Sequence, residues 1–438
     1  MIYEEAMKYI HEVGNFGSSY GLERTNRLLE ILGGPQKDLK LIHIAGTNGK
    51  GSITAMVTEL LKGKGFKVGM YTSPFLEEFE ERIQINGINI PKTILGELMD
   101  EVKAAVDKVV LEGFNHPTEF EIITCLMLLY FNKEKVDYGV VEVGLGGRLD
   151  STNVITPILS IIASISFDHT NLLGNTLGEI ALEKSGIIKN NIPVVIYPQE
   201  EEVYKVIKSK AEEMNATLYS LDDAEGMLIE IVSNESGYYQ RIALRLEGEE
   251  FQVDLPLLGE HQIKNLLVAL KAYKIICNNE KLSFNIEEVK TSISKVRWIG
   301  RLEVMGQKPL IVIDGAHNIQ GITALNENVK KYFKYDNIYL LLGILADKEV
   351  EKMVEVIAPS AKKVYALTPH SERAELCEDL KEVILKYNSN CIAVEDYKEA
   401  LKMVWKEAGE NDLILISGSL YMIGDMRREL GTILFSCL

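Results

Sequence analysis

The sequence predicts an α/β fold in two domains, each built on a mostly parallel β-sheet. Apolar runs of strand length alternate with segments of helical periodicity, first over residues 39–197 and again over residues 310–417. This alternation is typical of open sheets covered by helices on both faces. Between the two series, residues 216–258 change to period-two alternation with turn residues, which predicts a small β-rich annex on the first domain.

The first domain is expected to begin with amphipathic helix over residues 1–39, ended by Gly33-Gly34-Pro35. A further helix is predicted over residues 52–62. Another follows Gly259, with an apolar stripe formed by Ile263, Leu266, Leu267 and Leu270. The predicted strands are the apolar runs at residues 39–45, 138–143, 158–166 and 193–197.

The second domain is expected to begin after residue 297, so that the domains span residues 1–297 and 298–438. A chain of this length suits two or three domains of roughly 100–200 residues each. The second domain is the smaller one and is predicted to be a Rossmann-like α/β unit. Its predicted strands are residues 310–313, 338–343, 364–367, 392–394 and 413–417.

Composition narrows the class of protein. The net charge of −17 argues against a generally basic nucleic-acid-binding surface and against a polybasic membrane surface. The five cysteines are scattered and form no C-x-x-C pair, which predicts neither a disulfide framework nor a zinc site and suits a reducing compartment. The sequence shows no secretory signal and no apolar run near the ~20 residues of a membrane helix. We therefore expect a cytoplasmic protein.

The strongest local motif is Gly46-Thr47-Asn48-Gly49-Lys50-Gly51-Ser52, which follows the first strand and opens a helix. Glycines let the backbone approach phosphates, while successive N–H groups and the helix N-terminus supply positive potential. Lys50 would neutralise the outer phosphates, and Ser52 could reach a bound Mg²⁺. The usual phosphate-loop pattern is not met, because Ile44 replaces its first glycine and Gly51 separates Lys50 from Ser52. The strand–loop–helix context favours an ATP-binding P-loop ATPase-type domain over a tight turn with a solvated lysine.

Two further strands end in possible cation ligands. Glu142 places a carboxylate inside an apolar strand, where an unpaired charge is costly. Asp168 and His169 follow another strand. Because ligands bind at the carboxyl ends of strands in open α/β sheets, Glu142 and His169 are candidate Mg²⁺ ligands. An edge carboxylate and a surface histidine are the alternative.

A lysine lies on the inward face of a short helix that begins at a capping box of Thr176 and Glu179. Lys184 falls one turn beyond the apolar positions of this helix, so it must reach solvent, pair, or have a lowered pKa. The pattern alone favours a side chain that extends to solvent. In the second domain, Asp314-Gly315-Ala316-His317-Asn318 follows a strand and suits a ribose or amino-acid contact, although a simple Asx turn explains Asp314 equally well.

These motifs together resemble the folylpolyglutamate synthase/dihydrofolate synthase group of the Mur ligase family. The resemblance runs from Tyr20 to Tyr421. Small departures occur at Phe75, Ser185 and Ile299, where the family commonly has histidine, alanine and proline. The matching segments are Gly46–Ser52, Thr72–Phe75, Glu81–Ile83, Glu142–Asp150, Asp168–His169, Glu183–Gly186, Gly259–Gln262, Asn265, Gly300–Arg301, Asp314–Asn318, Asp347–Lys348 and Gly418–Tyr421.

The resemblance implies a reaction in which a folate-type carboxylate attacks the γ-phosphate of ATP. The amino group of L-glutamate then displaces phosphate from the acyl phosphate and forms an amide. It also implies that Ser73 and Glu142 hold one Mg²⁺ and His169 a second. Lys50, His169 and Lys184 would be the catalytic residues. Lys184 resembles a lysine that is carbamylated, which reverses the preference drawn from pattern alone.

The resemblance further assigns contacts on both sides of the reacting centre. Asn265, Arg301 and Asp314 resemble nucleotide contacts that are completed as the second domain closes. His317 and Ser417 would hold glutamate. The pterin-bearing substrate would lie near Arg82, Phe120 and Asp150.

Other functions stay open at this point. The enzyme could add the first glutamate to dihydropteroate, later glutamates to tetrahydrofolate, or both. A Mur-type ligase acting on another carboxylate and a nucleotide-binding regulator are the alternatives. The folate-like Ser73 loop counts against a ligase for another carboxylate. The presence of Glu142, His169 and Lys184 counts against a regulator, which would not need cation ligands. We expect a monomer with small-molecule substrates, without a nucleic-acid or membrane partner.

Overall fold

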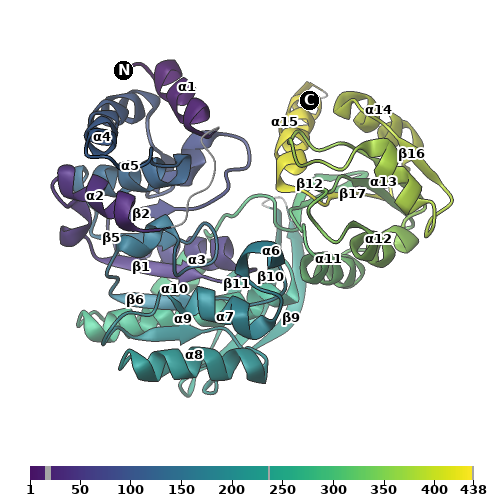
Figure 1. The fold of residues 1–438 in the computed structure, drawn as a ribbon. Helices are drawn as coiled ribbons and strands as arrows, with labels where there is room; N and C mark the ends of the chain where they lie inside the picture. Colours follow the sequence, from purple (N-terminus) through teal and green to yellow (C-terminus); the bar gives the residue numbers. More distant parts are fainter. Residues whose placement is uncertain (15–20, 235–236, 437–438) are drawn as a thin grey trace.

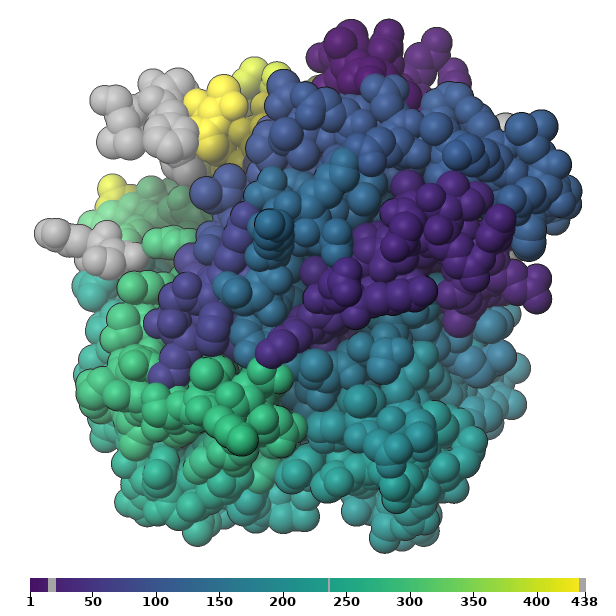
Figure 2. Space-filling model, turned by 90° about the vertical axis from the view of Figure 1, so that its left-hand side faces the viewer, coloured from purple at the N-terminus to yellow at the C-terminus, as the bar shows by residue number. Residues whose placement is uncertain are grey.

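The computed structural model describes residues 1–14, 21–234 and 237–436, and Tyr20 and Cys437 lie outside these ranges. Figure 1 shows two bodies, one holding the chain from its purple start through the green helices α9 and α10, and the other holding the later green-to-yellow part. Seen from the side, most of the visible surface comes from the first body, with the yellow C-terminal helix at its edge (Figure 2). No helix within the described ranges is long and apolar enough to cross a membrane.

The first body is built on an eight-stranded sheet in the order β4-β3-β2-β5-β1-β6-β7-β8. The pairs from β2 to β8 are parallel, and β3 and β4 add an antiparallel edge. The central strands are buried at every position, which explains their continuous apolar sequences. The strands are β1 (Leu41–Ala45), β2 (Val68–Tyr71), β3 (Ile83–Ile85), β4 (Ile88–Asn89), β5 (Tyr138–Glu142), β6 (Leu159–Ile162), β7 (Val194–Ile196) and β8 (Leu218–Tyr219).

Helices cover both faces of this sheet, as predicted. One face packs against a core that includes α3 and α9, and the other against a core that includes α1, α4 and α5. The predicted N-terminal helix is two helices and a short 3-10 turn, η1 (Pro35–Asp38). The helices are α1 (Tyr3–Gly14), α2 (Glu23–Ile31), α3 (Lys50–Gly63), α4 (Lys92–Leu111), α5 (Glu119–Lys133), α6 (Thr170–Leu173), α7 (Leu177–Ser185), α8 (Glu201–Glu213), α9 (Glu260–Asn279) and α10 (Ile286–Ile293), with η2 (Phe79–Arg82) and η3 (Ser151–Val154).

The β-rich annex is a three-stranded antiparallel sheet of β9 (Ala224–Asn234), β10 (Gly237–Leu246) and β11 (Glu249–Leu255). Alternate residues of β10 enter the core shared with α9, as the period-two pattern predicts. The annex is shorter than residues 216–258, because β8 pairs with β7 and so belongs to the main sheet. The two-residue strand β8 is too short to show a period of its own.

The second body holds a six-stranded sheet in the order β12-β13-β17-β14-β15-β16. All five predicted strands are present, and β12 is an additional antiparallel edge strand. Sequence patterning missed β12 because its side chains are only half-buried, so it carries no apolar run. The elements are β12 (Glu303–Gln307), β13 (Leu310–Asp314), β14 (Ile338–Leu342), β15 (Lys363–Ala366), β16 (Cys391–Ala393), β17 (Leu413–Ser417), α11 (Ile319–Tyr332), α12 (Val350–Ile357), η4 (Ala358–Ser360), α13 (Cys377–Ile384), α14 (Tyr397–Glu407) and α15 (Leu420–Ser436).

Candidate active site

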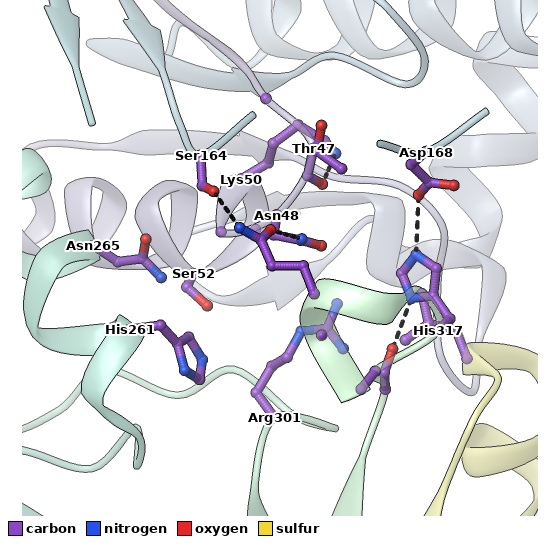
Figure 3. Close-up of a pocket in the computed structure, with 18 of the residues that line it drawn as sticks. Thr47, Asn48, Lys50, Ser52, Ser164, Asp168, His261, Asn265, Arg301 and His317 are labelled. Atoms are coloured by element: carbon purple, nitrogen blue, oxygen red, sulfur yellow. Dashed lines mark hydrogen bonds and ion pairs between the residues drawn. The ribbon is translucent and has the colours of Figure 1, made fainter. Parts of the chain in front are cut away.

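A pocket lies where the carboxyl ends of β1, β5 and β6 face the second body, which is where open α/β sheets bind ligands. The first body contributes the Gly46–Ser52 loop and Glu142. The second contributes Arg301, Asp314 and His317. In Figure 3, Arg301 faces Asn48 and Lys50 across the pocket, and His317 approaches Asp168. Predicted site residues that are far apart in the sequence therefore line the same pocket.

The glycines of the phosphate loop are required by close contacts. Gly46 has φ +153°, and a Cβ there would lie 2.6 Å from the Ala163 Cβ. At Gly49, with φ +88°, a Cβ would lie 2.6 Å from Asn265 Oδ1, so α9 closes directly on the loop. These contacts hold the backbone at the start of α3, where its N–H groups and the helix N-terminus favour phosphate.

Lys50 turns into the pocket rather than into solvent. Its side chain is 17% exposed, and its Nζ donates to Thr47 O at 3.2 Å and lies 3.8 Å from Glu142 Oε1. The alternative of a tight turn with a solvated lysine does not describe this arrangement. The ammonium group is placed to neutralise a phosphate bound at the loop.

Glu142 ends β5 and is almost completely buried. Its Oε2 accepts from the Ser73 backbone N–H at 3.4 Å. Burial raises the pKa of Glu142 to about 7, although nearby Lys50 opposes this rise. A carboxylate in such surroundings gains from a bound cation, so the donor chemistry of Glu142 and the Ser73 hydroxyl fits Mg²⁺. In the described part of the chain, no three His, Cys, Asp or Glu side chains cluster as metal ligands. Water and phosphate oxygens would therefore have to complete the coordination.

Asp168 joins the two bodies through an ion pair. Its Oδ1 accepts from Lys348 Nζ at 2.6 Å, and Oδ2 accepts from Asn318 Nδ2 at 3.4 Å. Burial alone would raise the pKa of Asp168, but Lys348 and neighbouring histidines hold it well below its usual range. Burial lowers the pKa of His169, the next residue, which favours the neutral imidazole that metals bind. Its Nε2 lies 3.9 Å from Asp168 Oδ1.

Lys184 is buried inside the pocket wall, so the solvent-reaching side chain favoured by pattern alone is wrong. Only 4% of the residue is exposed, and its Nζ donates to the Gly46 carbonyl at 2.9 Å. Burial, with a contribution from nearby Lys50, lowers the pKa of Lys184 to about 7. Its helix does begin at the predicted capping box of Thr176 and Glu179. With a pKa of about 7, a large fraction of the Lys184 amine is neutral and nucleophilic at neutral pH.

Asp314 has both carboxylate oxygens occupied by backbone N–H groups. Oδ1 accepts from Ala316 at 2.8 Å and Oδ2 from Leu302 at 2.8 Å, so the Asx turn is present. Asp314 nonetheless lines the pocket together with Arg301. The structure thus gives Asp314 a turn-forming role, in which it fixes the backbone on either side of the pocket entrance.

Sequence reasoning missed the role of Gln262, which links the phosphate loop to α9. Gln262 Nε2 donates to Ser52 Oγ at 3.2 Å, and Asn265 Nδ2 donates to Gln262 Oε1 at 3.0 Å. The i, i+3 spacing of these two residues on one helix face was the available signal. Asn48 is a second missed contact, because it bonds to Asn318 across the two bodies.

A second pocket adjoins the first and contains the residues expected on the pterin side, Arg82, Phe120 and Asp150. The Arg82 guanidinium lies over the Phe75 and Phe79 rings at 5.3 Å each. Asp150 accepts from the Thr152 and Leu145 backbone N–H groups at 2.9 Å, so it also holds the turn after β5. Burial raises the pKa of Asp150.

The structure places only one of the two predicted glutamate contacts in the cleft. His317 lines both pockets. Ser417 is fully buried at the end of β17 and lines neither pocket. Ser419, two residues later, lines the second pocket, and its Oγ has no partner. Both serines are buried, and sequence alone could not show this.

Comparisons with known proteins agree over nearly the whole chain. Residues 44–273 match the Mur ligase middle domain and residues 300–420 the Mur ligase glutamate ligase domain. The dihydrofolate synthase/folylpolyglutamate synthase of Bacillus subtilis is 36% identical over 98% of this chain and 99% of its own length. The folylpolyglutamate synthase of Lacticaseibacillus casei is 34% identical over 98% and 99%.

Solved structures give the same result. Mycobacterium tuberculosis folylpolyglutamate synthase complexed with ADP is 28% identical, with a TM-score of 0.89 over 98% of this chain and 99% of that chain. An FPGS complex with AMPPCP and folate is 32% identical, with a TM-score of 0.85 over 98% and 100%. The chain belongs to the Mur ligase family of ATP-dependent ligases and, within it, to the folylpolyglutamate and dihydrofolate synthases.

Proposed function

We propose that this protein is an ATP- and Mg²⁺-dependent ligase that adds L-glutamate to a folate-type carboxylate through an acyl phosphate. The observation that carries the proposal is the junction of the two pockets. Ser73, His169 and His317 line both of them. A nucleotide on the phosphate loop and an acceptor beside Phe120 would therefore meet at shared residues. Such positioning is the main source of catalysis in phosphoryl transfer.

In the first step, an acceptor carboxylate oxygen attacks the γ-phosphorus, and the bond to the β-phosphate oxygen breaks to release ADP. Lys50 and the loop N–H groups neutralise the charge that develops on the phosphates. Ser73 and Glu142 would hold one Mg²⁺ and His169 a second, supplying further charge neutralisation. Asn265, Arg301 and Asp314 are proposed to surround the nucleotide, as resemblance to the family implies.

In the second step, the glutamate amine attacks the acyl carbon, and the amide forms as phosphate leaves and the ammonium loses a proton. Lys184 is proposed to act as a carbamate, formed when its neutral amine adds CO₂ and releases a proton. His317 is proposed to hold glutamate. Ser417 is buried and lines neither pocket, so it is not proposed as a direct contact. Closure of the second domain would exclude water, which otherwise hydrolyses the acyl phosphate.

The remaining assignments are also proposals. We propose a cytoplasmic monomer with domains 1–297 and 298–438, divided in the segment between α10 and β12. Its proposed partners are ATP, L-glutamate and a folate or pteroate acceptor, with no nucleic acid and no membrane. The acceptor could be dihydropteroate, tetrahydrofolate or both.

The test is incorporation of labelled L-glutamate with ATP and Mg²⁺, with 7,8-dihydropteroate and tetrahydrofolate compared as acceptors. Label in both products identifies a bifunctional synthase, and label in one assigns the acceptor. Label in neither, with ATP still bound, rejects the folate assignment and directs the search to other carboxylates. Lys50→Ala should lose most of this incorporation. Lys62→Ala is its matched control, because Lys62 lies on the same helix and pairs with nearby Glu59.

A further inference from the structure

A rigid loop of the first body reaches the second body. It runs from Ser73, at the junction of the pockets, to Arg82 in the acceptor pocket. The Thr72 N–H donates to Arg82 O at 3.0 Å and so joins the two ends of the loop. Inside the loop, the Glu81 carboxylate accepts N–H bonds from Leu76 at 2.8 Å and from Glu77 at 3.1 Å. These bonds tie the loop tip to Glu81 and tie Arg82, the next residue, to Thr72, so the tip is connected to both ends of the loop.

The tip of this loop packs on the C-terminal helix α15. Leu76 packs against the hydrophobic core of the second body. A Cβ on Gly424 would lie only 1.9 Å from Leu76 O, so the helix needs glycine where the loop crosses it. Gly300, at the junction between the bodies, would likewise place a Cβ 3.1 Å from a Leu76 methyl group. The loop tip, α15 and the interdomain junction are thus in direct contact.

Arg427 of α15 joins these three elements by charge-assisted hydrogen bonds. Its Nη1 donates to Glu77 Oε1 at the loop tip, at 2.5 Å. Its Nε and Nη2 donate to Glu303 at 3.1 and 2.9 Å. Glu303 Oε2 in turn accepts from the Gly300 N–H at 2.8 Å, and Gly300 directly precedes Arg301 of the nucleotide pocket. All three side chains are about one-fifth to one-quarter exposed, which makes their bonds stronger than those of a freely solvated pair.

We propose that Arg427 is a positioning residue that couples the acceptor side of the active site to its nucleotide side. This inference rests on the proposed function, because it needs an acceptor that binds beside the loop. Arg427 lines neither pocket, so it acts only through Glu77 and Glu303. When Arg427 holds both carboxylates, the Ser73–Arg82 loop and the Gly300–Arg301 junction are fixed relative to each other. Nucleotide binding at one end then favours acceptor binding at the other.

The test measures this coupling in the full-length enzyme. Tetrahydrofolate or dihydropteroate, whichever the wild type uses, is titrated with and without AMPPCP and Mg²⁺. We expect AMPPCP to tighten acceptor binding to the wild type at least fivefold. In Arg427→Gln this gain should fall to less than twofold, while acceptor affinity without nucleotide stays within twofold of wild type. Arg427→Lys, which keeps the charge but can reach fewer acceptors, should recover part of the gain.

Arg241→Gln is the matched control. Arg241 also bridges two carboxylates, Glu230 and Asp254, but within the annex and away from both pockets. It should keep the full coupling, so an equal loss in Arg241→Gln and Arg427→Gln would overturn the inference. If Arg427→Gln does not fold, Glu77→Gln removes the carboxylate charge that pairs with Arg427 at the loop tip and leaves the Leu76 contact and the Arg428 bond to Glu77 O in place. It should show the same loss of coupling.

The outcomes separate the inference from the proposed function. A wild type that binds neither acceptor, with or without nucleotide, contradicts the proposed function. A wild type that binds an acceptor without any gain from AMPPCP, or an Arg427→Gln variant that retains the gain, contradicts only the coupling. Loss of coupling in Arg427→Gln and in Glu77→Gln, with no further loss in the double variant, supports one shared contact.

Discussion

Replacement of Lys184 by methionine should stabilise the first domain while it abolishes ligase activity. The lysine is buried in a wall of the pocket, and burial lowers its pKa to about 7. The fall from 10.5 to about 7 corresponds to about 5 kcal/mol of destabilisation at low pH, at about 1.4 kcal/mol per unit. Loss of the bond to the Gly46 carbonyl offsets about 1 kcal/mol. We therefore expect a gain of up to about 4 kcal/mol in the free energy of unfolding at pH 6.

The sign of the pH dependence follows from the lowered pKa. Below pH 7 both the folded and unfolded states carry the charge, so the full penalty of burying it is present. As the pH rises from about 7 toward 10.5, the folded state is neutral while the unfolded chain still binds a proton. The penalty therefore shrinks and vanishes above pH 10.5. The gain from Lys184→Met should shrink over the same interval.

Urea unfolding in CO₂-free buffer, followed by tryptophan fluorescence, measures this gain. A Trp405→Phe background leaves Trp298, whose ring lies against Gly51 of the phosphate loop, as the reporter of the first domain. Lys62→Met on the exposed face of α3 is the control and should change stability by less than about 0.5 kcal/mol. Activity of decarbonated wild-type enzyme should recover when bicarbonate is added. A Lys184→Met variant that is less stable at pH 6 than wild type, or fully active, would refute this reasoning.

Three other substitutions test separate parts of the account. Lys50→Ala should lower kcat by about 10²–10³-fold without a change in melting temperature, because it removes charge neutralisation but little packing; wild-type turnover would remove Lys50 from the site. Gly51→Ala should weaken binding of an ATP analogue and shift Trp298 emission, because the new Cβ would lie 2.4 Å from the indole; unchanged titrations would contradict this. His43→Asn should reduce the pH dependence of the free energy of unfolding by up to about 1.4 kcal/mol per pH unit between pH 6 and 4. Burial lowers the pKa of His43 to about 3, so over this range the folded state keeps the neutral ring while the unfolded chain binds a proton; equal slopes for variant and wild type would count against it.

Sequence patterning found the elements whose burial leaves a continuous signal. The central strands β1 and β5 are buried at every position, so their apolar runs are uninterrupted. The edge strand β12 and the two-residue strand β8 leave no such run, and both were missed or misplaced. Local pattern therefore loses the edges of a sheet, where side chains are half-exposed. It also missed β2, which is buried at every position, because this four-residue strand contains Gly69 and carries no long apolar run.

Some residues of the candidate site could likewise be recognised from local sequence, whereas the contacts of others could not. The phosphate loop is local, and its glycines and lysine are recognisable in one stretch of sequence. The environment of Lys184 is not encoded locally. Helical periodicity shows only that the side chain faces inward, and not that its Nζ donates a hydrogen bond to the Gly46 carbonyl. The contact between Asp168 and Lys348 joins residues 180 positions apart and depends on how the two bodies meet. Resemblance to a family identified such residues, whereas only the structure shows their partners.

The most direct test of the proposed chemistry is the fate of oxygen from the acceptor carboxylate. The wild-type enzyme is supplied with ATP, Mg²⁺, L-glutamate and an acceptor whose reacting carboxylate carries ¹⁸O, and the released phosphate is analysed by mass spectrometry. An acyl phosphate intermediate predicts one ¹⁸O atom in the phosphate for each amide formed. Amide formation with unlabelled phosphate would contradict the mechanism at its first step.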